Sequence, residues 1–258
     1  MLKEVSQGKR ALNTGWQPRD KKIQNFIPKK ELVTGELDGC KALIAITKGC
    51  NNFCSFCIVP TTRGRLVSRE LSNILEGAND LISKGAKEIQ LLGQNVNSYE
   101  TGDADFYKLL KAVADLPGLK RVRFTSPHPN DWNNKLTDLM ADHPVICNHI
   151  HLPFQAGADR ILDLMRRGHT KEEYLSKIDY IKNKIPNISI TTDAIVGFPG
   201  ESDSEFQETL EVIKSVKFSQ IYAFKYSVRP GTKAESLLDD VGKKDKEERL
   251  AKLLELQE

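Results

Sequence analysis

The chain has 258 residues, a hydrophobic content of 39% and a formal net charge of +3. This composition is typical of a folded globular protein with one large domain or two small ones, and so small a charge argues against polyanion binding through bulk charge alone. No apolar run approaches the ~18 residues of a membrane span, and the N-terminal "MLKEVSQGKR" has no apolar segment typical of a secretory signal. We therefore expect a cytoplasmic protein without membrane contact, whose cysteines serve as ligands rather than in disulfides.

Residues 1–38 are expected to form a linker or arm ahead of the folded part of the chain. Lysine and arginine recur in this segment, within the stretch "KRALNTGWQPRDKKIQNFIPKK". A basic segment of this kind is either a solvated arm or one that faces RNA, and both interpretations stay open.

From residue 39 onward, short apolar runs alternate with amphipathic helical segments. The first expected strand covers residues 41–47, and a helix is expected over 68–86, where apolar residues recur at intervals of three and four and Ser68 is the N-cap. The next two strands are expected at 87–96 and 120–126. The helices that follow them span residues 106–116, ended by Pro117 and Gly118, and residues 133–143.

Three more strands are expected in the second half of the chain, at residues 148–155, 189–198 and 220–228. Asp203 is the expected N-cap of the helix between the last two strands. The expected helices of this half span residues 159–167, 171–185, 203–216 and 243–258.

Six such alternations predict an α/β fold with a parallel sheet and right-handed crossovers. Because a closed barrel of this kind needs eight units, we expect an open (βα)6 partial TIM barrel over residues 39–240, followed by a C-terminal helix within 241–258. Ligands of such folds bind beyond the carboxyl ends of the strands. The segments at those ends read "KGC", "GQNVN", "TSPHP", "PFQAG", "VGFPGE" and "SVRPGT".

Three of the five cysteines, Cys50, Cys54 and Cys57, form one C-x3-C-x2-C run. A closed zinc site takes four ligands, so zinc here would need Cys40 or Cys147, and buried free thiols are a second alternative. Thiolates are also the standard ligands of iron–sulfur clusters. Three thiolates can each hold one iron of a cubane, which leaves the fourth iron open to a small molecule and to chemistry. Outside a zinc site, we expect Cys40 and Cys147 to be small core residues.

A cysteine run of this spacing after the first strand of an open βα barrel resembles the radical S-adenosylmethionine (SAM) superfamily. The resemblance implies that the open iron chelates the amino and carboxylate groups of SAM, and that an electron from the cluster cleaves SAM to a 5′-deoxyadenosyl radical. Within the superfamily, residues 20–240 resemble the MiaB-type tRNA methylthiotransferases. The stretches that carry this resemblance are "GCNNFCSFCIVPTTRGRLVSR", "LLGQNVNSY", "HLPFQAGADRILDLMRRGHTKEEY", "TTDAIVGFPGES" and "FKYSVRPGTKA".

This family resemblance implies a transferase of tRNA processing. Its members place a methylthio group on carbon 2 of N6-isopentenyladenosine at position 37 of tRNA, where the hydrogen is not acidic and a carbon radical must remove it. An electron donor such as flavodoxin or ferredoxin and a monomeric state are expected. A ribosomal-protein methylthiotransferase and a non-catalytic RNA-binding remnant are the alternatives.

The resemblance also implies roles for single residues. Cys50, Cys54 and Cys57 would hold the 4Fe–4S cluster, and the glycine of "VGF" would let adenine approach closely. The residues expected to bind SAM are Gly93, Gln94, Asn95, Gln155, Arg166 and Gly197. The residues expected to face the RNA substrate are Arg63, Arg65 and Arg229.

Members of the resembled family also have an N-terminal domain that binds an auxiliary 4Fe–4S cluster and a C-terminal TRAM domain that binds RNA. The sequence has no cysteine upstream of Cys40, so the ligands of a second cluster are absent from it. We therefore expect the chain to correspond to the central domain of the family, able to cleave SAM but impaired in sulfur insertion and in tRNA binding.

Overall fold

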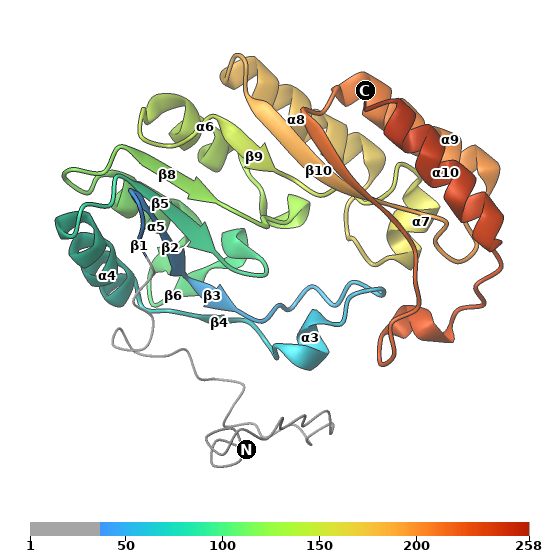
Figure 1. Ribbon diagram of the computed structural model, residues 1–258, viewed down its shortest axis with the longest axis horizontal. Helices are drawn as coiled ribbons and strands as arrows, with labels where there is room; N and C mark the ends of the chain where they lie inside the picture. Colours follow the sequence, from blue (N-terminus) through green and yellow to red (C-terminus); the bar gives the residue numbers. More distant parts are fainter. Residues whose placement is uncertain (1–36, 258) are drawn as a thin grey trace, which may run out of the picture.

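The computed structural model describes residues 37–257, so the linker expected over 1–38 lies almost entirely outside the described residues. Six strands form the framework of the fold (Figure 1). Wherever two of the six pair within a sheet, they run parallel to each other. They are β2 (Lys41–Ala45), β5 (Glu88–Leu92), β8 (Arg121–Phe124), β9 (His149–His151), β10 (Ser189–Val196) and β11 (Gln220–Lys225).

The strands belong to two sheets that together form an open arc. One sheet has the order β1-β2-β5-β8, in which β1 (Leu37–Asp38) is antiparallel to β2, and the other has the order β9-β10-β11. A parallel bridge between Val122 and Ile146 connects the sheets at their junction. Within residues 37–257 no strand of the first sheet pairs with β11, so the arc does not close. The predicted α/β fold with an open partial barrel is therefore confirmed.

Helices cover the outer side of the arc (Figure 1). Neighbouring helices contact each other in the order α4, α5, α6, α8 and α9, and α10 lies against β11 and β10. None of the helices in the described part of the chain is long and apolar enough to cross a membrane. The main helices are α4 (Leu71–Ser83), α5 (Phe106–Ala114), α6 (Asn134–Asp142), α7 (Asp159–Leu164), α8 (Lys171–Lys184), α9 (Asp203–Val216) and α10 (Lys243–Glu255).

Short elements lie in the loops between these strands and helices. Two antiparallel pairs are formed by β3 (Thr47–Lys48) with β4 (Val67–Ser68) and by β6 (Glu100–Thr101) with β7 (Ala104–Asp105). The remaining short helices are α3 (Val59–Thr62), η2 (Val96–Ser98), η3 (Pro129–Asp131) and η4 (Lys233–Ser236).

The hydrophobic core lies between the strands and the outer helices. Ile44, Ile89 and Val122 of three adjacent strands are at most 3% exposed and belong to one cluster with the apolar faces of the helices. In the second half, the rings of Phe154 and Phe218 stack at 5.7 Å. Parallel strands are buried by crossover helices in this way, and the polar segments at their carboxyl ends are left at one rim of the arc.

Two helix starts differ from the prediction. Ser68 belongs to β4 instead of capping a helix, and its hydroxyl accepts a hydrogen bond from the backbone N–H of Glu100 at 3.1 Å. The N-cap of α9 is Ser202 and not Asp203: Ser202 Oγ accepts from the N–H of Glu205 at 3.3 Å, and the Glu205 carboxylate accepts from the N–H of Ser202 at 2.8 Å. This reciprocal pair is a capping box, so Asp203 becomes the first residue of the helix.

Replacing Ser202 by alanine is expected to lower the free energy of unfolding by about 1 kcal/mol, because the N–H of Glu205 loses its acceptor. Ser204→Ala is the matched control on the same turn, since within residues 37–257 the Ser204 hydroxyl bonds only to Ser202 Oγ, at 3.0 Å. Denaturant unfolding of both variants checks the assignment. Equal losses in the two variants would contradict it.

Candidate functional site

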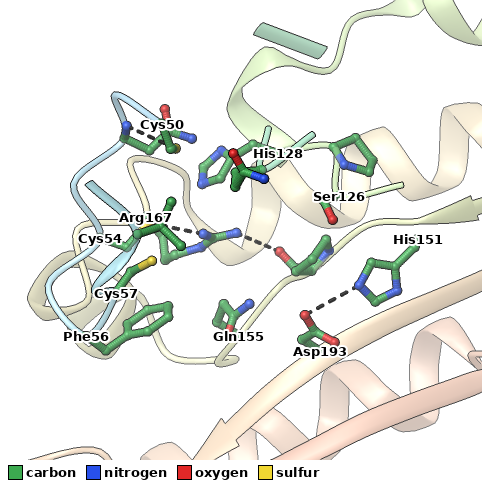
Figure 2. A pocket seen from close by; sticks show the side chains of 15 residues that line it. Cys50, Cys54, Phe56, Cys57, Ser126, His128, His151, Gln155, Arg167 and Asp193 are labelled. Carbon is green, nitrogen blue, oxygen red and sulfur yellow. Dashed lines mark hydrogen bonds and ion pairs between the residues drawn. The ribbon is translucent and has the colours of Figure 1, made fainter. Parts of the chain in front are cut away.

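A cavity of about 220 Å³ opens at the carboxyl ends of the strands. Its wall combines the loop after β3 with the carboxyl ends of β5, β8 and β9, the segment after α7 and one residue of β10. Figure 2 shows the cysteines of the loop on one side of this cavity and the residues of the second sheet on another. The polar and thiol side chains that line it are Cys50, Cys54, Cys57, Asn52, Gln94, Ser126, His128, His151, Gln155, Arg167 and Asp193.

The start of the cysteine loop is held by backbone contacts that only glycine allows. Gly49 has φ +76°, and a Cβ atom there would lie 2.2 Å from the carbonyl oxygen of Arg65. The N–H of Gly49 donates to Gln94 Oε1 at 2.7 Å, and the N–H of Cys50 donates to the carbonyl of Gly64 at 3.3 Å. The loop is thereby attached to the end of β5, which places Cys50 at the cavity.

The middle of the loop is attached to the end of α7. The last carbonyls of a helix have no partner within it, and here the N–H of Ser55 donates to the carbonyl of Met165 at 2.9 Å while Ser55 Oγ donates to that of Leu164 at 2.7 Å. The N–H of Cys57 donates to the carbonyl of Cys54 at 3.0 Å, which turns the chain between these two cysteines. Both thiols therefore face the cavity.

The three thiols are partly withdrawn from water. Cys54 is 9% exposed, while Cys50 and Cys57 are half-buried, and burial raises the pKa of the Cys50 and Cys57 thiols. Metal ligation needs thiolates, and a bound metal deprotonates such thiols. Within residues 37–257, no three His, Cys, Asp or Glu side chains are grouped closely enough to share a single metal ion.

Cys40 and Cys147, the possible fourth ligands of a zinc site, lie away from this cavity. Cys40 precedes β2 and Cys147 precedes β9, so both lie at the amino ends of strands whose carboxyl ends face the cavity. The expectation that Cys40 is a core residue is wrong, because its side chain is exposed in the turn between β1 and β2, and Cys147 is half-buried.

Arg167, just beyond α7, places a cation in contact with one of the cysteine sulfurs. It is 5% exposed, and its guanidinium donates to Cys54 Sγ at 3.3 Å and to the carbonyl of Pro153 at 2.9 Å. Its Nε is buried without a partner among the described residues. The predicted cofactor residue, Arg166, is instead exposed, has φ +56° and does not line the cavity. Of these two adjacent arginines it is therefore Arg167 that reaches the cavity, from a turn in which Arg166 has left-handed backbone angles.

Of the three residues after β5 that were predicted to bind SAM, one lines the cavity and two do not. Gln94 lines the cavity and also holds Gly49. Gly93 does not line it, but a Cβ there would lie 2.1 Å from Thr47 Oγ1, so glycine permits the close approach of β3. Asn95 is 1% exposed and its amide donates to Asp131 Oδ2 at 2.6 Å, away from the lining set.

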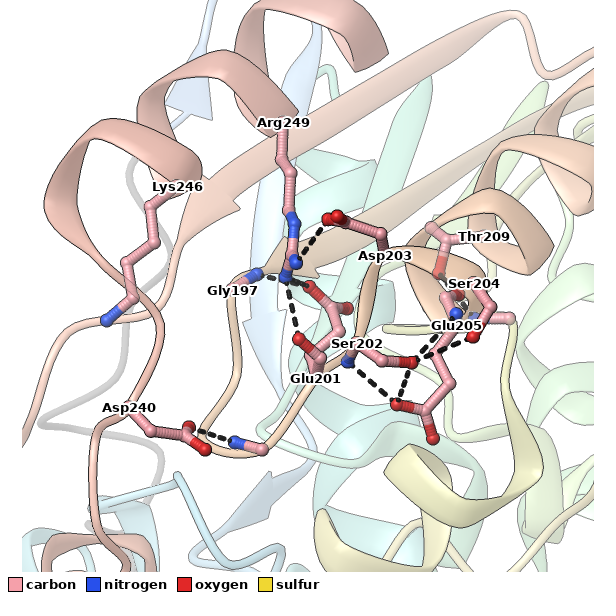
Figure 3. Close-up of polar contacts among 12 residues, drawn as sticks. Gly197, Glu201, Ser202, Asp203, Ser204, Glu205, Thr209, Asp240, Lys246 and Arg249 are labelled. Carbon is pink, nitrogen blue, oxygen red and sulfur yellow. Dashed lines mark hydrogen bonds and ion pairs between the residues drawn. The ribbon is translucent and has the colours of Figure 1, made fainter.

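After β9 and β10, likewise, one residue predicted to bind SAM lines the cavity and another does not. Gln155 lines the cavity with a positive φ of 73°, and it is held by a backbone bridge to Ala194. Gly197 lies outside the cavity with φ +68°, and a Cβ there would lie 2.3 Å from Lys246 Cγ of α10. Its N–H donates to Glu201 Oε2 at 2.6 Å (Figure 3), so Gly197 is a packing position in this structure.

His128 and Asp193 are lining residues to which the sequence assigned no role. His128 belongs to the "TSPHP" segment at the end of β8, and only its place after a strand was a signal. Asp193 projects from within β10, where its Oδ2 lies 3.4 Å from His151 Nε2. Asp193 lies inside a strand, whereas the expectation from the sequence covered only the segments that follow the strands.

Two further cavities adjoin the first. One of about 200 Å³ lies on the other side of the cysteine loop and is lined by Arg65 and Lys233, with the Arg65 guanidinium 4.1 Å from the centre of the Phe53 ring. The other, of about 280 Å³, is lined by Arg229 and shares Phe56, Gln155 and Asp193 with the first cavity. Arg63 is exposed on the segment after α3. The predicted RNA-facing arginines thus lie on the rim around the cysteine loop.

The chain is similar to known proteins both in sequence and in fold. A profile of the radical SAM superfamily matches residues 44–213. The chain is 42% identical over 260 residues to the tRNA-2-methylthio-N(6)-dimethylallyladenosine synthase of Geotalea uraniireducens (strain Rf4), and the match covers 100% of this chain and 58% of that protein. The proteins of the same name from Syntrophotalea carbinolica and Sulfurihydrogenibium sp. are 47% and 49% identical over 218 residues, covering 83% and 84% of this chain and 50% of each relative. The chain therefore spans about half the length of these relatives.

Solved structures share the fold at much lower identity. The radical S-adenosylmethionine methyltransferase TsrM from Kitasatospora setae, with cobalamin and a 4Fe-4S cluster bound, superposes with a TM-score of 0.61 at 18% identity, over 74% of this chain and 38% of that one. Methylornithine synthase (PylB) gives a TM-score of 0.57 at 15% identity, over 84% of this chain and 62% of that one. At these identities the likeness establishes the fold only.

Proposed function

The chain belongs to the radical SAM superfamily, and from this premise we propose that it is the SAM-cleaving core of a tRNA methylthiotransferase. The proposed substrate is N6-isopentenyladenosine at position 37 of tRNA, and the product carries a methylthio group on carbon 2. The observation that carries the proposal is the convergence of three cysteines from one loop on a cavity at the carboxyl ends of an open parallel arc. The identity to synthases named for this modified nucleoside supports the choice of substrate.

The residues present fit a cubane cluster. The proposed ligands Cys50, Cys54 and Cys57 are all sulfur donors, as iron–sulfur clusters require. Buried N–H groups of Arg167 and His128 lack partners among the described residues, and a sulfur-rich anion at the cavity would supply acceptors. When bound, the cluster and SAM supply a carbon-centred oxidant that removes a hydrogen too weakly acidic for any base.

The side chains of this protein bind and orient the cofactor. Arg167 provides a buried positive charge beside Cys54, and its guanidinium would suit the SAM carboxylate as a further partner. Gln155, Asp193 and Phe56 line both the first and the third cavity. The two polar side chains would bind the ribose hydroxyls of SAM, and the Phe56 ring would contact the adenine. Gln94 holds the cysteine loop through Gly49, whose N–H donates to Oε1, and the second lone pair of Oε1 would accept a hydrogen bond from the SAM amino group.

The basic rim is proposed to bind the phosphates of tRNA. Arg65→Ala and Arg229→Ala are each expected to weaken tRNA binding and to reduce the slope of log K against log salt by about 1, because each variant loses one phosphate contact. Fluorescence anisotropy with labelled tRNA at several salt concentrations measures this slope. Arg121→Ala is the matched control, since Arg121 pairs with Glu88 at the amino end of its strand. An equal change in all three variants would contradict a defined RNA face.

Several further parts of the proposal rest on the family alone. We propose flavodoxin or ferredoxin as electron donor, a monomeric state and a cytoplasmic location, with an auxiliary 4Fe–4S cluster held outside the residues of this chain. The proposed domain organisation remains a linker over 1–38, a core over 39–240 and a C-terminal helix within 241–258. Support for the last of these comes from α10, whose residues 243–255 lie within that range.

Hydrogen abstraction tests the proposed reaction without requiring sulfur insertion. The iron-reconstituted chain is incubated with SAM, a reductant and tRNA that carries deuterium on carbon 2 of isopentenyladenosine 37. We expect deuterium in the 5′-deoxyadenosine that is formed, and much less product label with tRNA that lacks the isopentenyl group. Unlabelled 5′-deoxyadenosine would contradict the proposed substrate. Deuterium transferred only from a deuterated ribosomal protein would establish the alternative transferase. A chain that binds tRNA but holds no iron would be the non-catalytic RNA-binding remnant.

A further inference from the structure

His128 is held at the cavity by a buried clamp. Its backbone N–H donates to Asn97 Oδ1 at 2.7 Å, and its carbonyl accepts from Asn97 Nδ2 at 3.0 Å. Both side chains are 7% exposed, and His128 lies between Pro127 and Pro129, whose φ angles are fixed by their rings. The position of the imidazole is therefore set by the fold before any ligand binds.

The hydrogen bonds of the ring determine its tautomer. His128 Nδ1 accepts from the N–H of Asn130 at 3.2 Å, so in the neutral ring the proton lies on Nε2. Burial, together with the charges of Arg167 and His169, lowers the pKa of His128 to about 2. The Nδ1 hydrogen bond and the burial of the ring both favour the neutral Nε2–H form.

This donor has no acceptor in the described part of the chain. His128 Nε2 is buried without a hydrogen-bond partner, and the residue lines the cavity together with Cys50, Cys54 and Arg167 (Figure 2). A buried N–H left unpaired costs about 1–3 kcal/mol. An acceptor bound at the cavity and within reach of Nε2 would remove that cost.

His169 is the nearest alternative partner. The rings of His128 and His169 meet edge to face at 76° with centroids 6.3 Å apart, and His169 Nε2 is also buried without a partner among residues 37–257. A water molecule between the two rings is thus the competing explanation. His169 does not line the cavity, which makes it the matched control for a ligand-directed role.

We propose that His128 Nε2–H donates a hydrogen bond to a sulfur atom of the cluster held by Cys50, Cys54 and Cys57, and that this bond raises the reduction potential of the cluster. The inference rests on the proposed cluster site. Hydrogen bonds to cluster sulfurs stabilise the more negative, reduced state. His128 would therefore make the cluster easier for a biological donor to reduce, as the one-electron cleavage of SAM requires.

Midpoint potentials of the reconstituted cluster test this inference, measured by EPR-monitored redox titration without SAM. His128→Phe keeps a ring of similar size and removes the donor. We expect its cluster to be about tenfold harder to reduce, which is a shift of about −59 mV for a one-electron couple. His128→Gln retains an N–H donor and is expected to restore most of the shift, and His169→Phe is expected to leave the potential unchanged.

A wild-type potential in His128→Phe, or an equal shift in His169→Phe, would overturn the inference, because the buried ring would then act through packing or water. If His128→Phe fails to load iron, wild-type protein labelled with 15N-histidine provides the second measurement. Its reduced cluster should show a 15N hyperfine coupling, and the absence of that coupling would overturn the hydrogen bond. Failure of the wild type itself to hold iron would instead contradict the proposed function.

Discussion

Cys54→Ala is expected to abolish both iron binding and 5′-deoxyadenosine formation. Cys54 is the most buried of the three thiols in the cavity and the one that Arg167 contacts. Its removal leaves two ligands for a cluster that needs three from the protein, and it leaves the Arg167 guanidinium beside an apolar methyl group. Iron and sulfide content, absorbance near ~400 nm, where clusters with thiolate ligands absorb, and product analysis after anaerobic reconstitution measure the effect.

Cys147→Ala is the control for this experiment. Cys147 is a half-buried thiol at the amino end of the second sheet and lies outside the cavity. We expect wild-type iron content and SAM cleavage from this variant. Iron retained in Cys54→Ala but lost in Cys147→Ala would contradict the assigned ligand set and would favour a site built from other thiols.

Arg249→Met is expected to lower the free energy of unfolding by about 3–5 kcal/mol, the usual cost of leaving a buried charge without its partner. Arg249 connects α10 to the end of β10: its guanidinium donates to Glu201 Oε2 at 2.9 Å and to the Glu201 carbonyl at 3.0 Å (Figure 3). It also donates to Asp203 Oδ1 at 2.8 Å. The side chains of Arg249 and Glu201 are 8% and 1% exposed, so water cannot replace the lost partner.

Glu247→Gln is the control on the same helix. Glu247 pairs with Lys225 of β11 at 3.0 Å, but both side chains are well exposed. Exposed ion pairs contribute little to stability, so we expect its denaturation curve to remain close to that of the wild type. Similar losses in the two variants would show that the burial of the Arg249 pair is not what stabilises α10 on the core.

The cost of Arg249→Met is also expected to depend on pH. Burial raises the pKa of Glu201 even with Arg249 in place, and loss of Arg249, which lowers that pKa, raises it further. A folded-state pKa above the unfolded value means that protonation stabilises the folded form. The difference in the free energy of unfolding between wild type and variant should therefore be largest above the folded-state pKa of Glu201 in the variant. It should shrink as the pH falls through that value. A difference independent of pH would contradict an unpaired Glu201 charge as its cause.

The sequence alone determined the class of fold and the metal ligands proposed here. Apolar runs of strand length alternating with amphipathic helices carry the (βα)6 arrangement, because the burial of a parallel sheet leaves a periodic signal along the chain. The run of Cys50, Cys54 and Cys57 is equally local, since three thiols on one loop need no distant residue to come together. The prediction of an open arc followed from the number of units.

The tertiary structure decided which neighbouring side chains reach the cavity. Arg167 and not Arg166 faces Cys54, since a left-handed residue follows α7, and Ser68 pairs in a strand because a distant segment binds it. Asp193 and His128 lie on separate sheets and meet at one cavity only when the arc curves. Strand and helix periodicity depends on neighbours a few residues away, whereas the direction and partner of a polar side chain depend on contacts across the whole fold.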